Sequence, residues 1–284
     1  MVSNFSLSLR RMKKRRTTKK LEILACNDDG IDAPGLYALV QELKKIGSVI
    51  VVAPDKQQSA VGHAITMSYP LRMKEFKKDG KFFGYAVQGT PADCVKLAVR
   101  AILKRKPDLV VSGINHGSNT AISIIYSGTV SAATEGTILG IPSIAMSVTT
   151  YGKVDFRFAA KFAKKLALLV LKKGLPERTL LNVNVPPLKE EELQGVLVTR
   201  QGRSIWNDTF DTRRDPGNKE YFWLTGGLDE ADTDLEFDQA AVRNNYISIS
   251  PIQYDLTDYA MMDVLNRWNL DELINQTMRK KAKP

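Results

Sequence analysis

"ILACNDDGIDAPG", residues 23–35, sets the architecture expected for this 284-residue chain. A short apolar run ends in two adjacent carboxylates, Asp28 and Asp29, and Pro34, a residue type favoured at the first position of a helix, follows shortly after. This order predicts a buried strand, a polar loop and a helix, which together begin a βαβ unit. Two unit charges ~4 Å apart at an effective dielectric of about 20 repel by roughly 4 kcal/mol, so the aspartate pair needs a compensating partner.

Short apolar runs alternate with helical patterns through the first two thirds of the chain, which is typical of a mainly parallel sheet in an α/β fold with helices on both faces. We predict strands at residues 22–26, 48–53, 108–112, 142–147 and 180–185. We predict helices at 34–45, from 91 through ADCVKLAVRAILKR, at about 129–139 and at about 155–172. The last helix carries apolar residues on one face and lysines on another, so we expect it to be structural.

The remaining segments predict β-hairpins and a terminal helix. Residues 71–87 are expected to form a hairpin turned at Asp79-Gly80, because Asp-Gly is a strong hairpin signal. After residue 186 three extended stretches, GVLVTRQG, YFWLTG and NYISISPIQ, indicate hairpins or an antiparallel arm, and an amphipathic helix is expected at about 259–280. The expected organisation is therefore a basic tail at 1–20, an α/β core at 21–186, and a β-rich arm with a C-terminal helix at 187–284.

The formal net charge of +10 is concentrated at the N-terminus. Eight of the basic residues lie within residues 1–20, which contain no acid, so the rest of the chain is nearly neutral. The simplest interpretation is a disordered basic tail, and an arm that contacts RNA or another anionic surface is the alternative. The order of basic and apolar residues does not match a secretory signal, and translation beginning at Met12 is a third interpretation.

Composition favours a soluble, cytoplasmic protein. The hydrophobic fraction of 43% and the charged fraction of 25% exclude a mainly disordered chain. No uninterrupted apolar run approaches the ~20 residues of a membrane-spanning helix, so we expect no membrane partner. Cys26 and Cys94, the only cysteines, both lie in apolar contexts and are expected to be buried thiols in a reducing compartment.

Four loops rich in small and oxygen-bearing residues follow predicted strands or open a helix: NDDGIDAPG, PDKQQSAVGH, GINHGSN and YSGTV. Such loops converge outside the carboxyl ends of a parallel sheet. A shared proton, a basic side chain or a divalent cation would each offset Asp28 and Asp29. Neutral oxygen donors are plentiful in these loops: Asn27, Ser59, Ser112, Asn115, Ser118 and Asn119. This mixture suits Mg²⁺ or Mn²⁺, and the lack of a His/Cys cluster argues against zinc. A helix N-cap with a solvated turn remains the alternative.

The SGIN and YSGTV segments predict an anion pocket. Ser127 or Thr129 is suited to cap the helix that follows, and the exposed N–H groups at a helix N-terminus attract anions. Opposite a metal loop, this arrangement predicts a phosphate held between a cation and a helix N-terminus.

A family resemblance rests on six blocks in consistent order: ILACNDDGIDAPGL, VVAPDKQQSAVGHAIT, VQGTPADCVKLA, LVVSGINHGSN, YSGTVSAATEGTILGIPSIAMS and DQAAVRNNYISISPIQYDLTD. Together they resemble the survival protein SurE family of metal-dependent nucleoside-monophosphate phosphatases. The resemblance covers residues 22 to 258. It implies a Rossmann-like core, a protruding hairpin, and a homodimer or homotetramer built partly by exchange of C-terminal elements, which would make the C-terminal helix an oligomerisation element.

The resemblance also implies the chemistry of the site. One divalent cation, Mg²⁺ or Mn²⁺, per subunit is expected on Asp28, Asp29, Ser59 and Asn115, and the expected reaction is hydrolysis of nucleoside 5′- and 3′-monophosphates, with short polyphosphate as a further substrate. One departure concerns the loop after the second strand. It usually reads Arg-Ser-Gly, whereas this chain has Gln58-Ser59-Ala60, which puts substrate preference and loop shape in question.

The expected mechanism assigns roles around the cation. Asp28 and Asp29 are the expected catalytic carboxylates, and Asp29 is the more plausible proton acceptor for the attacking water. Asn27, Gly113, Ser127, Gly128 and Thr129 are expected to hold phosphate oxygens by hydrogen bonds. His116 is a candidate to protonate the leaving group, and a histidine that is simply hydrogen-bonded in a polar loop is the plainer interpretation.

Three other functions compete with this hypothesis. A covalent aspartyl-phosphate enzyme needs Asp-x-Asp, and Asp29 and Asp32 stand at the wrong offsets from Asp28. A dinucleotide-dependent oxidoreductase is disfavoured because no Gly-x-Gly-x-x-Gly follows the first strand. A nucleotide- or RNA-binding protein, whose basic tail supplies affinity, remains open. Trp206 and Tyr126 are candidates to stack on a base, although core or interface roles are the plainer interpretation for both.

Overall fold

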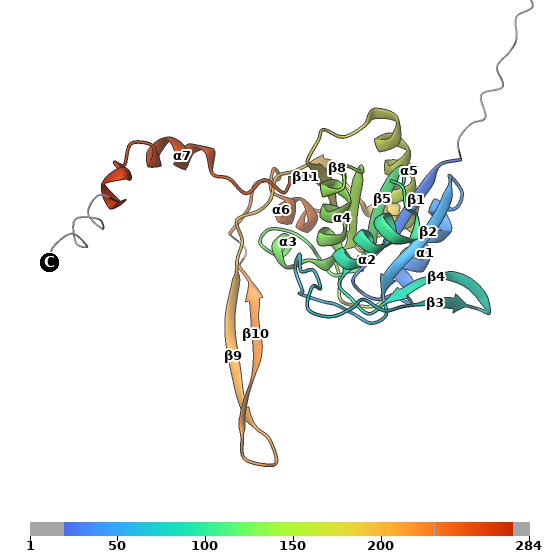
Figure 1. Ribbon diagram of the computed structural model, residues 1–284, viewed down its shortest axis with the longest axis horizontal. Helices are drawn as coiled ribbons and strands as arrows, with labels where there is room; N and C mark the ends of the chain where they lie inside the picture. The colour runs from blue at the N-terminus through green and yellow to red at the C-terminus, as the bar shows by residue number, and fades with distance from the viewer. Residues whose placement is uncertain (1–19, 230, 275–284) are drawn as a thin grey trace, which may run out of the picture.

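The computed structural model describes residues 20–229 and 231–274 of the chain (Figure 1). The predicted basic tail, apart from Lys20, and its contact with nucleic acid lie outside these residues. The architecture is α/β, with one nine-stranded, mostly parallel sheet in the order β3-β4-β2-β1-β5-β6-β7-β11-β8 and a separate two-stranded hairpin, β9-β10. None of the helices in the described part of the chain is long and apolar enough to cross a membrane.

The five predicted core strands are confirmed. They are β1 (Glu22–Cys26), β2 (Ser48–Pro54), β5 (Leu109–His116), β6 (Ser143–Val148) and β7 (Thr179–Val185), and they pair in parallel. β1, β6 and β7 are almost entirely buried, as expected of parallel strands that helices cover on both faces. β5 is longer than predicted, because it continues through an irregularity between Ser112 and Asn115 into the polar loop sequence.

Helices cover both faces of this sheet (Figure 1). On one face α1 (Pro34–Leu43) packs with α5 (Arg157–Lys173), and on the other α2 (Pro91–Leu97) packs with α4 (Gly128–Ile138). Each pair buries apolar side chains against the strands in its own cluster. The predicted long helix after residue 91 is α-helical only to Leu97 and continues as a π-helical turn at Ala98–Ile102.

The hairpin expected at 71–87 is confirmed as β3 (Met73–Lys78) and β4 (Lys81–Val87). Asp79 and Gly80 have φ angles of 52° and 74°, the positive values that a two-residue type I′ turn requires at both central positions. β4 also pairs in parallel with β2, so this hairpin extends the main sheet.

The extended stretches after residue 186 are arranged differently from the arm we expected. YFWLTG lies in β10 (Glu220–Leu228), which pairs with β9 (Trp206–Arg214) in a protruding hairpin (Figure 1). GVLV forms β8 (Gly195–Val198) and YISISPIQ forms β11 (Tyr246–Gln253), and both join the main sheet. β11 differs from the hairpin strands in its burial. Its residues Ile247, Ser248 and Ser250 are buried in the main sheet, whereas the strands of the hairpin are mostly exposed.

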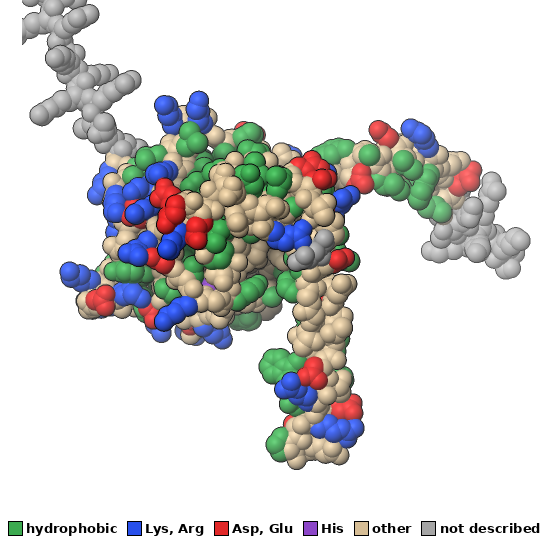
Figure 2. All heavy atoms as spheres, turned by 180° about the vertical axis from the view of Figure 1, so that it is seen from behind, with side chains coloured by type: hydrophobic (Ala, Val, Ile, Leu, Met, Phe, Trp, Pro, Cys, Tyr) green, Lys and Arg blue, Asp and Glu red, His purple; other side chains and the backbone are tan. Residues whose placement is uncertain are grey.

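The C-terminal segment leads away from the body of the molecule (Figure 1). α7 spans Tyr259–Leu265, turns follow, and residues 271–274 are helical again, so one continuous helix from 259 is wrong for the described residues. The predicted end at 280 lies outside them. α7 ends with Asn266 as its C-cap, and farther along the Asn269 side chain donates a hydrogen bond to Glu272 at 2.6 Å. Figure 2 shows apolar side chains gathered along this segment.

Candidate functional site

The candidate site lies at the point in the sheet where the order of the strands reverses, between β1 and β5. β1 is flanked by β2 on one side and β5 on the other, so the loops that leave β1 and β5 diverge to opposite faces and open a crevice between them. The first loop carries the predicted aspartate pair, and the extended end of β5 carries Asn115. The crevice therefore brings together two of the four loops expected to converge.

The loop after β1 is a tight turn that Asn27 closes. The Asn27 side chain is fully buried and its Nδ2 donates to the Gly30 carbonyl at 2.9 Å. Gly30 has a φ of +101°, a conformation that L side chains rarely adopt, which explains a glycine directly after the carboxylates. The turn holds Asp28 and Asp29 at the end of the buried strand.

Asp28 is a buried carboxylate at the N-terminus of α4. The Thr129 hydroxyl donates to its Oδ1, and a Cβ added at Gly128 would lie 2.6 Å from the Asp28 Cβ, so glycine allows the helix to approach this closely. Burial raises the pKa of the Asp28 carboxyl to about 6; the hydrogen bond from Thr129 lowers it and the charge of Asp29 raises it.

Asp29 faces the end of β5. Its Oδ2 accepts a hydrogen bond from the backbone N–H of His116 at 3.1 Å. Burial raises the pKa of this carboxyl too, against the opposing influence of His116. Among the described residues no Lys or Arg forms an ion pair with Asp28 or Asp29. Of the three partners considered for the pair, a Lys or Arg in direct ion-pair contact is therefore not found in the described part of the chain.

Ser59 reaches the site on the loop after β2. The backbone N–H of Gln58 donates to the Asp28 carbonyl at 2.8 Å, which joins this loop to the first one. The Ser59 hydroxyl accepts a hydrogen bond from Gln57 at 2.8 Å. Ala60 follows with a φ of +56°, in the region that favours glycine, so alanine is strained at the position where the resemblance had suggested glycine.

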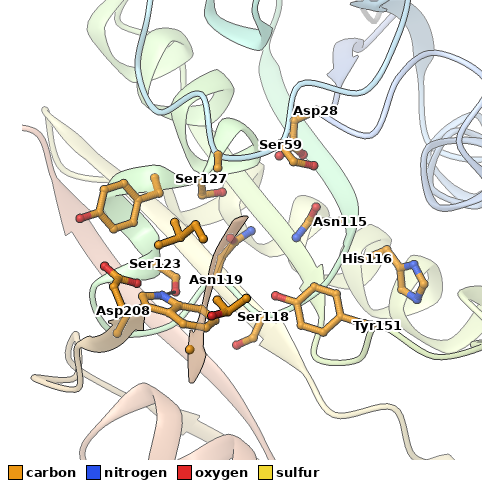
Figure 3. A pocket seen from close by; sticks show the side chains of 16 residues that line it. Asp28, Ser59, Asn115, His116, Ser118, Asn119, Ser123, Ser127, Tyr151 and Asp208 are labelled. Atoms are coloured by element: carbon orange, nitrogen blue, oxygen red, sulfur yellow. Dashed lines mark hydrogen bonds between the residues drawn. The ribbon is translucent and has the colours of Figure 1, made fainter. Parts of the chain in front are cut away.

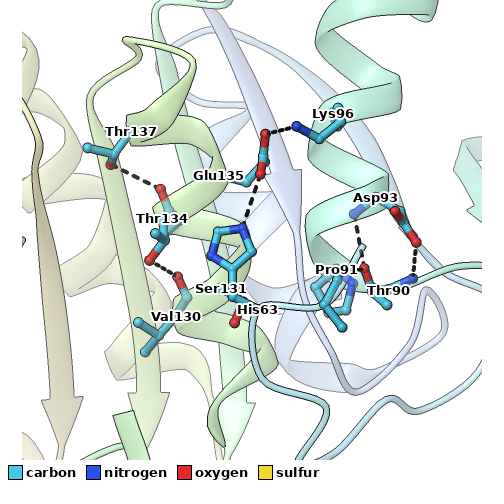
Figure 4. Close-up of polar contacts among 12 residues, drawn as sticks. His63, Thr90, Pro91, Asp93, Lys96, Val130, Ser131, Thr134, Glu135 and Thr137 are labelled. Carbon is cyan, nitrogen blue, oxygen red and sulfur yellow. Dashed lines mark hydrogen bonds and ion pairs between the residues drawn. The ribbon is translucent and has the colours of Figure 1, made fainter. Parts of the chain in front are cut away.

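Buried polar contacts fasten the rest of this loop to the helices behind it (Figure 4). His63 Nε2 lies 3.1 Å from a carboxylate oxygen of Glu135 on α4, and Lys96 on α2 donates to the other oxygen at 2.6 Å. Burial alone would raise the pKa of Glu135, but these two hydrogen bonds outweigh it and lower the pKa. Thr66 donates twice to Asp93, at 2.9 and 2.6 Å. No sequence motif indicates these contacts between the loop and the two helices, because the residues that form them lie far apart in the chain.

Asn115 lines the pocket with its amide side chain. Its Nδ2 donates to the Gly117 carbonyl at 2.8 Å, and its oxygen is turned toward Asp28 (Figure 3). Below it, the backbone of Asn119 is tied to Asn184 and Asn182 on β7 at 2.9 and 2.8 Å. These contacts connect the floor of the crevice to the sheet.

The start of α4 carries three residues predicted to hold phosphate. Ser127 caps the helix by accepting from the Val130 N–H at 3.1 Å, and its side chain lines the pocket. Gly128 and Thr129 lie against Asp28 instead of lining the pocket. Ser127 and the helix N-terminus behind it therefore form the edge of the pocket at which an anion could be held.

Two other predicted residues have structural contacts. A Cβ at Gly113 would lie 2.3 Å from the Met146 carbonyl, so this glycine allows β5 and β6 to approach closely. The His116 Nε2 lies 2.6 Å from the Gly152 carbonyl oxygen, to which it donates, and the ring packs edge-on against Phe156. The side chain of His116 still borders the pocket.

A pocket of about 620 Å³ joins these groups (Figure 3). The predicted site residues and candidate oxygen donors that line it are Asp28, Ser59, Asn115, His116, Ser118, Asn119 and Ser127, with Tyr126 and Trp206 from the aromatic candidates. Asp29 is not among the lining residues. Sequence reasoning did not place Ser123, Tyr151, Asp208, Leu224, Thr225 and Gly226 there. The last four of these residues belong to the base of the β9-β10 hairpin, and no local motif indicates that this base lies beside the site.

The donor set at one end of the pocket fits a hard divalent cation. Asp28, Ser59 and Asn115 line this end with a carboxylate, a hydroxyl and an amide group, and Asp29 follows Asp28 in the chain but is not among the lining residues. Carboxylate and neutral oxygens are the mixture that Mg²⁺ and Mn²⁺ prefer. In residues 20–229 and 231–274, no three His, Cys, Asp or Glu side chains come together as a metal site. The two carboxylates, each with a pKa raised by burial, form no ion pair with a Lys or Arg of the described residues, which leaves a divalent cation or a shared proton as the group that would compensate them.

Comparison with known proteins places this chain in a family. The family model described as survival protein SurE matches residues 23–208. The chain is 50% identical over 262 residues to a 5′-nucleotidase SurE of Chlorobaculum tepidum, covering 92% of this chain and 100% of that protein. It is 52% identical over 252 residues to the 5′-nucleotidase SurE of Chlorobium phaeobacteroides, covering 89% and 98%. The crystal structure of a SurE protein from Aquifex aeolicus superimposes with a TM-score of 0.75 at 44% identity, covering 86% of this chain and 97% of that one.

Proposed function

The chain belongs to the survival protein SurE family, and we propose that it hydrolyses nucleoside 5′- and 3′-monophosphates at Asp28 and Asp29 with one bound Mg²⁺ or Mn²⁺. It is a hydrolase of phosphomonoesters, of the nucleotidase type that its relatives' names describe. The observation that supports the proposed site is the pair of adjacent carboxylates, raised in pKa by burial and without a basic partner, beside the N-terminus of α4.

The proposed cation ligands are Asp28, Asp29, Ser59 and Asn115. When bound, the cation supplies Lewis acidity, which polarises the phosphoryl group and makes a water molecule more acidic. The backbone supports this geometry: Gln58 N–H fixes the Ser59 loop to Asp28, and His116 N–H fixes the orientation of Asp29. Such supporting contacts hold the ligand oxygens in place before substrate arrives.

The phosphate is proposed to lie between this donor set and Ser127. The Ser127 side chain and the N–H groups at the start of α4 hold and orient phosphate oxygens, because a helix N-terminus carries partial positive charge. Asn27, Gly113, Gly128 and Thr129 support the loops around the phosphate, and direct phosphate contacts for them remain predictions. Asp29 is the proposed acceptor of the proton from the attacking water.

The role of His116 as leaving-group acid remains a prediction as well. One ring nitrogen donates to the Gly152 carbonyl, so only the other could face substrate. A His116→Asn variant tests the role: a loss of turnover that is large for adenosine monophosphate and small for p-nitrophenyl phosphate, whose leaving group needs no proton, supports it, and equal losses for both substrates remove it.

A phosphate-release assay tests the function. Purified protein is incubated with adenosine 5′- and 3′-monophosphate, other mononucleotides and short polyphosphate, with Mg²⁺, Mn²⁺ or Zn²⁺. We expect release from mononucleotides with Mg²⁺ or Mn²⁺ and its loss on chelation. Turnover that survives chelation, or no turnover of any mononucleotide, would contradict the proposal.

We further propose that the chain forms a homodimer or homotetramer through its C-terminal segment. Leu256, Trp268 and Leu273 are 92%, 54% and 63% exposed on a segment that leaves the body of the molecule. Covering them against a second copy would bury this apolar surface. Light scattering on the full chain and on a chain ending at Gln253 tests this: at least twice the monomer mass is expected for the former and a smaller assembly for the latter. Equal assembly states would contradict it.

The two cysteines, both free and buried, support a reducing, cytoplasmic location.

A further inference from the structure

The far wall of the pocket is built by the base of the β9-β10 hairpin. Trp206 and Asp208 come from β9, and Leu224, Thr225 and Gly226 come from β10. Figure 3 shows Ser123 and Asp208 on the opposite side of the pocket from Asp28 and Ser59. The base of the hairpin, formed by the start of β9 and the end of β10, therefore forms one wall of the site.

Hydrogen bonds hold this wall in place against the loop before α3 (Ser123–Tyr126). The Gln201 side chain donates to the Ala121 carbonyl at 3.0 Å, and the Ile122 N–H donates to the Ser204 carbonyl at 3.4 Å. The buried carboxylate of Asp238, at the start of α6 (Asp238–Arg243), accepts from the backbone N–H groups of both Ala121 and Gly202. The segment that leads into β9 and the loop that borders the pocket are therefore one connected unit.

Trp206 sits at the end of this unit with its polar edge satisfied. Its indole Nε1 donates to the Ser123 hydroxyl at 3.1 Å, which fixes the position of the ring beside the pocket. The side chain is nevertheless 39% exposed. A fixed, partly uncovered aromatic face has little conformational freedom to lose when a flat ligand stacks on it.

Charge orients a ligand along the pocket. The end at Asp28, Ser59 and Asn115 is where the cation and phosphate are proposed to lie. The Asp208 carboxylate lies at the hairpin end and repels a phosphate there. The part of the substrate near the hairpin is therefore the uncharged part, and a pocket of about 620 Å³ falls within the roughly 300–1,000 Å³ range of sites that enclose a small organic ligand.

We propose that Trp206 determines specificity by stacking on the base of the nucleotide whose phosphate lies at Asp28. This inference rests on the proposed function, since it assumes that phosphate end. Stacking is tolerant of the base, because every base has a π face, so Trp206 favours nucleotides over phosphomonoesters without a ring system. The contact is present before and during the reaction, so its loss is expected to raise KM and leave kcat nearly unchanged.

The test compares adenosine 5′-monophosphate with ribose 5-phosphate, which lacks only the base. For Trp206→Ala we expect kcat/KM for the nucleotide to fall about 5- to 100-fold, through KM, and kcat/KM for ribose 5-phosphate to change less than about twofold. Trp206→Phe should retain most of the nucleotide preference. Trp223→Ala is the matched control, because Trp223 lies on β10, is 58% exposed and does not line the pocket.

Each outcome decides the proposal. An equal loss for both substrates in Trp206→Ala would mean that Trp206 only holds the hairpin in place, and no loss for either would mean that the base lies elsewhere. Calorimetry without divalent metal measures the same difference as a binding affinity, by titrating adenosine 5′-monophosphate and ribose 5-phosphate into wild type and Trp206→Ala. Failure of the wild type to turn over either substrate would overturn the proposed function, and the binding contrast would still decide the role of Trp206.

Discussion

The hydroxyl of Thr129, at the start of α4, donates a hydrogen bond to the Asp28 carboxylate at the end of β1. This contact joins the two halves of the site, the loop proposed to hold a cation and the helix N-terminus proposed to hold phosphate. It also lowers the pKa of Asp28 against the effect of burial. Burial still raises the pKa on balance, so the hydrogen bond offsets only part of that effect in favour of the anionic form that a cation ligand requires.

Thr129→Val replaces that hydroxyl with a methyl group of similar size. We expect the apparent affinity for Mn²⁺ to fall about 10- to 100-fold, the range for partners that orient a ligand. Without the hydrogen bond the pKa of Asp28 rises further, so protons compete better and the loss is larger at pH 6 than at pH 8. Calorimetric titration at both pH values measures it. Thr129→Ser keeps the hydroxyl and should bind within about threefold of wild type; a valine variant that binds as the serine variant does would refute the role.

His63→Leu removes the contact between the Ser59 loop and Glu135. We expect hydrogen exchange of backbone amides in residues 56–66 to quicken by about tenfold or more, because the loop loses one of its attachments to α4. Apparent Mn²⁺ affinity should fall several-fold, since Ser59 is then less well positioned.

Lys96→Met is the matched control for that variant. It removes the other hydrogen bond to Glu135 from a helix, and leaves the loop itself intact. Its exchange in residues 56–66 should stay near the wild-type rate. Equal quickening in both variants would show that Glu135 acts by general stabilisation of α4 and not by holding the loop.

Ala60→Gly tests the strain at the residue after Ser59. The φ of +56° costs an L residue roughly 1–2 kcal/mol, and glycine avoids that cost while losing about 0.5–1 kcal/mol to the greater freedom of the unfolded chain. We expect the free energy of unfolding in urea to rise by up to about 1 kcal/mol, and Ala60→Val to lower it. A glycine variant clearly less stable than wild type would show that the loop does not carry this strain.

Glu42→Gln tests the ion pairs that join α1 to α5. Hydrogen bonds from Lys164 and then Lys45 lower the pKa of Glu42 below its ordinary 4.5. The folded state therefore gains stability from this group above about pH 4.5 and loses it as pH falls through the lowered pKa. We expect the free energy of unfolding of the variant to be about 1 kcal/mol lower than that of wild type at pH 7. Most of this difference is expected from Lys164, because Lys45 is exposed and contributes little. The difference should shrink towards pH 3. A difference independent of pH would contradict the assignment.

Much of this fold is predictable because local pattern and burial agree. The core strands carry continuous apolar runs, and Asp79-Gly80 specifies its hairpin through backbone geometry alone. The strands β8 and β11 were misassigned to the arm, because alternating residues look alike on an edge strand and on a free hairpin. Only tertiary packing buries Ser248 and Ser250 on the sheet.

The site shows the same division. Asp28 and Asp29 stand out in the sequence as adjacent carboxylates at a strand end, whereas only the family resemblance selects Ser59 and Asn115 from the other oxygen donors in the loops. The His63–Glu135 contact spans 72 positions and the Trp206–Ser123 contact spans 83, so neither has a local signature. The sequence therefore predicts the carboxylates of the proposed site, whereas the residues that shape the pocket through distant contacts are found only in the structure.

Binding of Mn²⁺ to Asp28→Asn is the most direct test of the central claim that the neighbouring carboxylates hold a cation for phosphate hydrolysis. Asp32→Asn is its control, because Asp32 lies in the same loop but is exposed and paired with Lys78 at 2.6 Å. Titration followed by electron paramagnetic resonance should show one bound Mn²⁺ per chain in the wild type and in Asp32→Asn, and at least 100-fold weaker binding in Asp28→Asn, with loss of phosphate release from adenosine monophosphate. Wild-type Mn²⁺ affinity and turnover in Asp28→Asn would contradict the account.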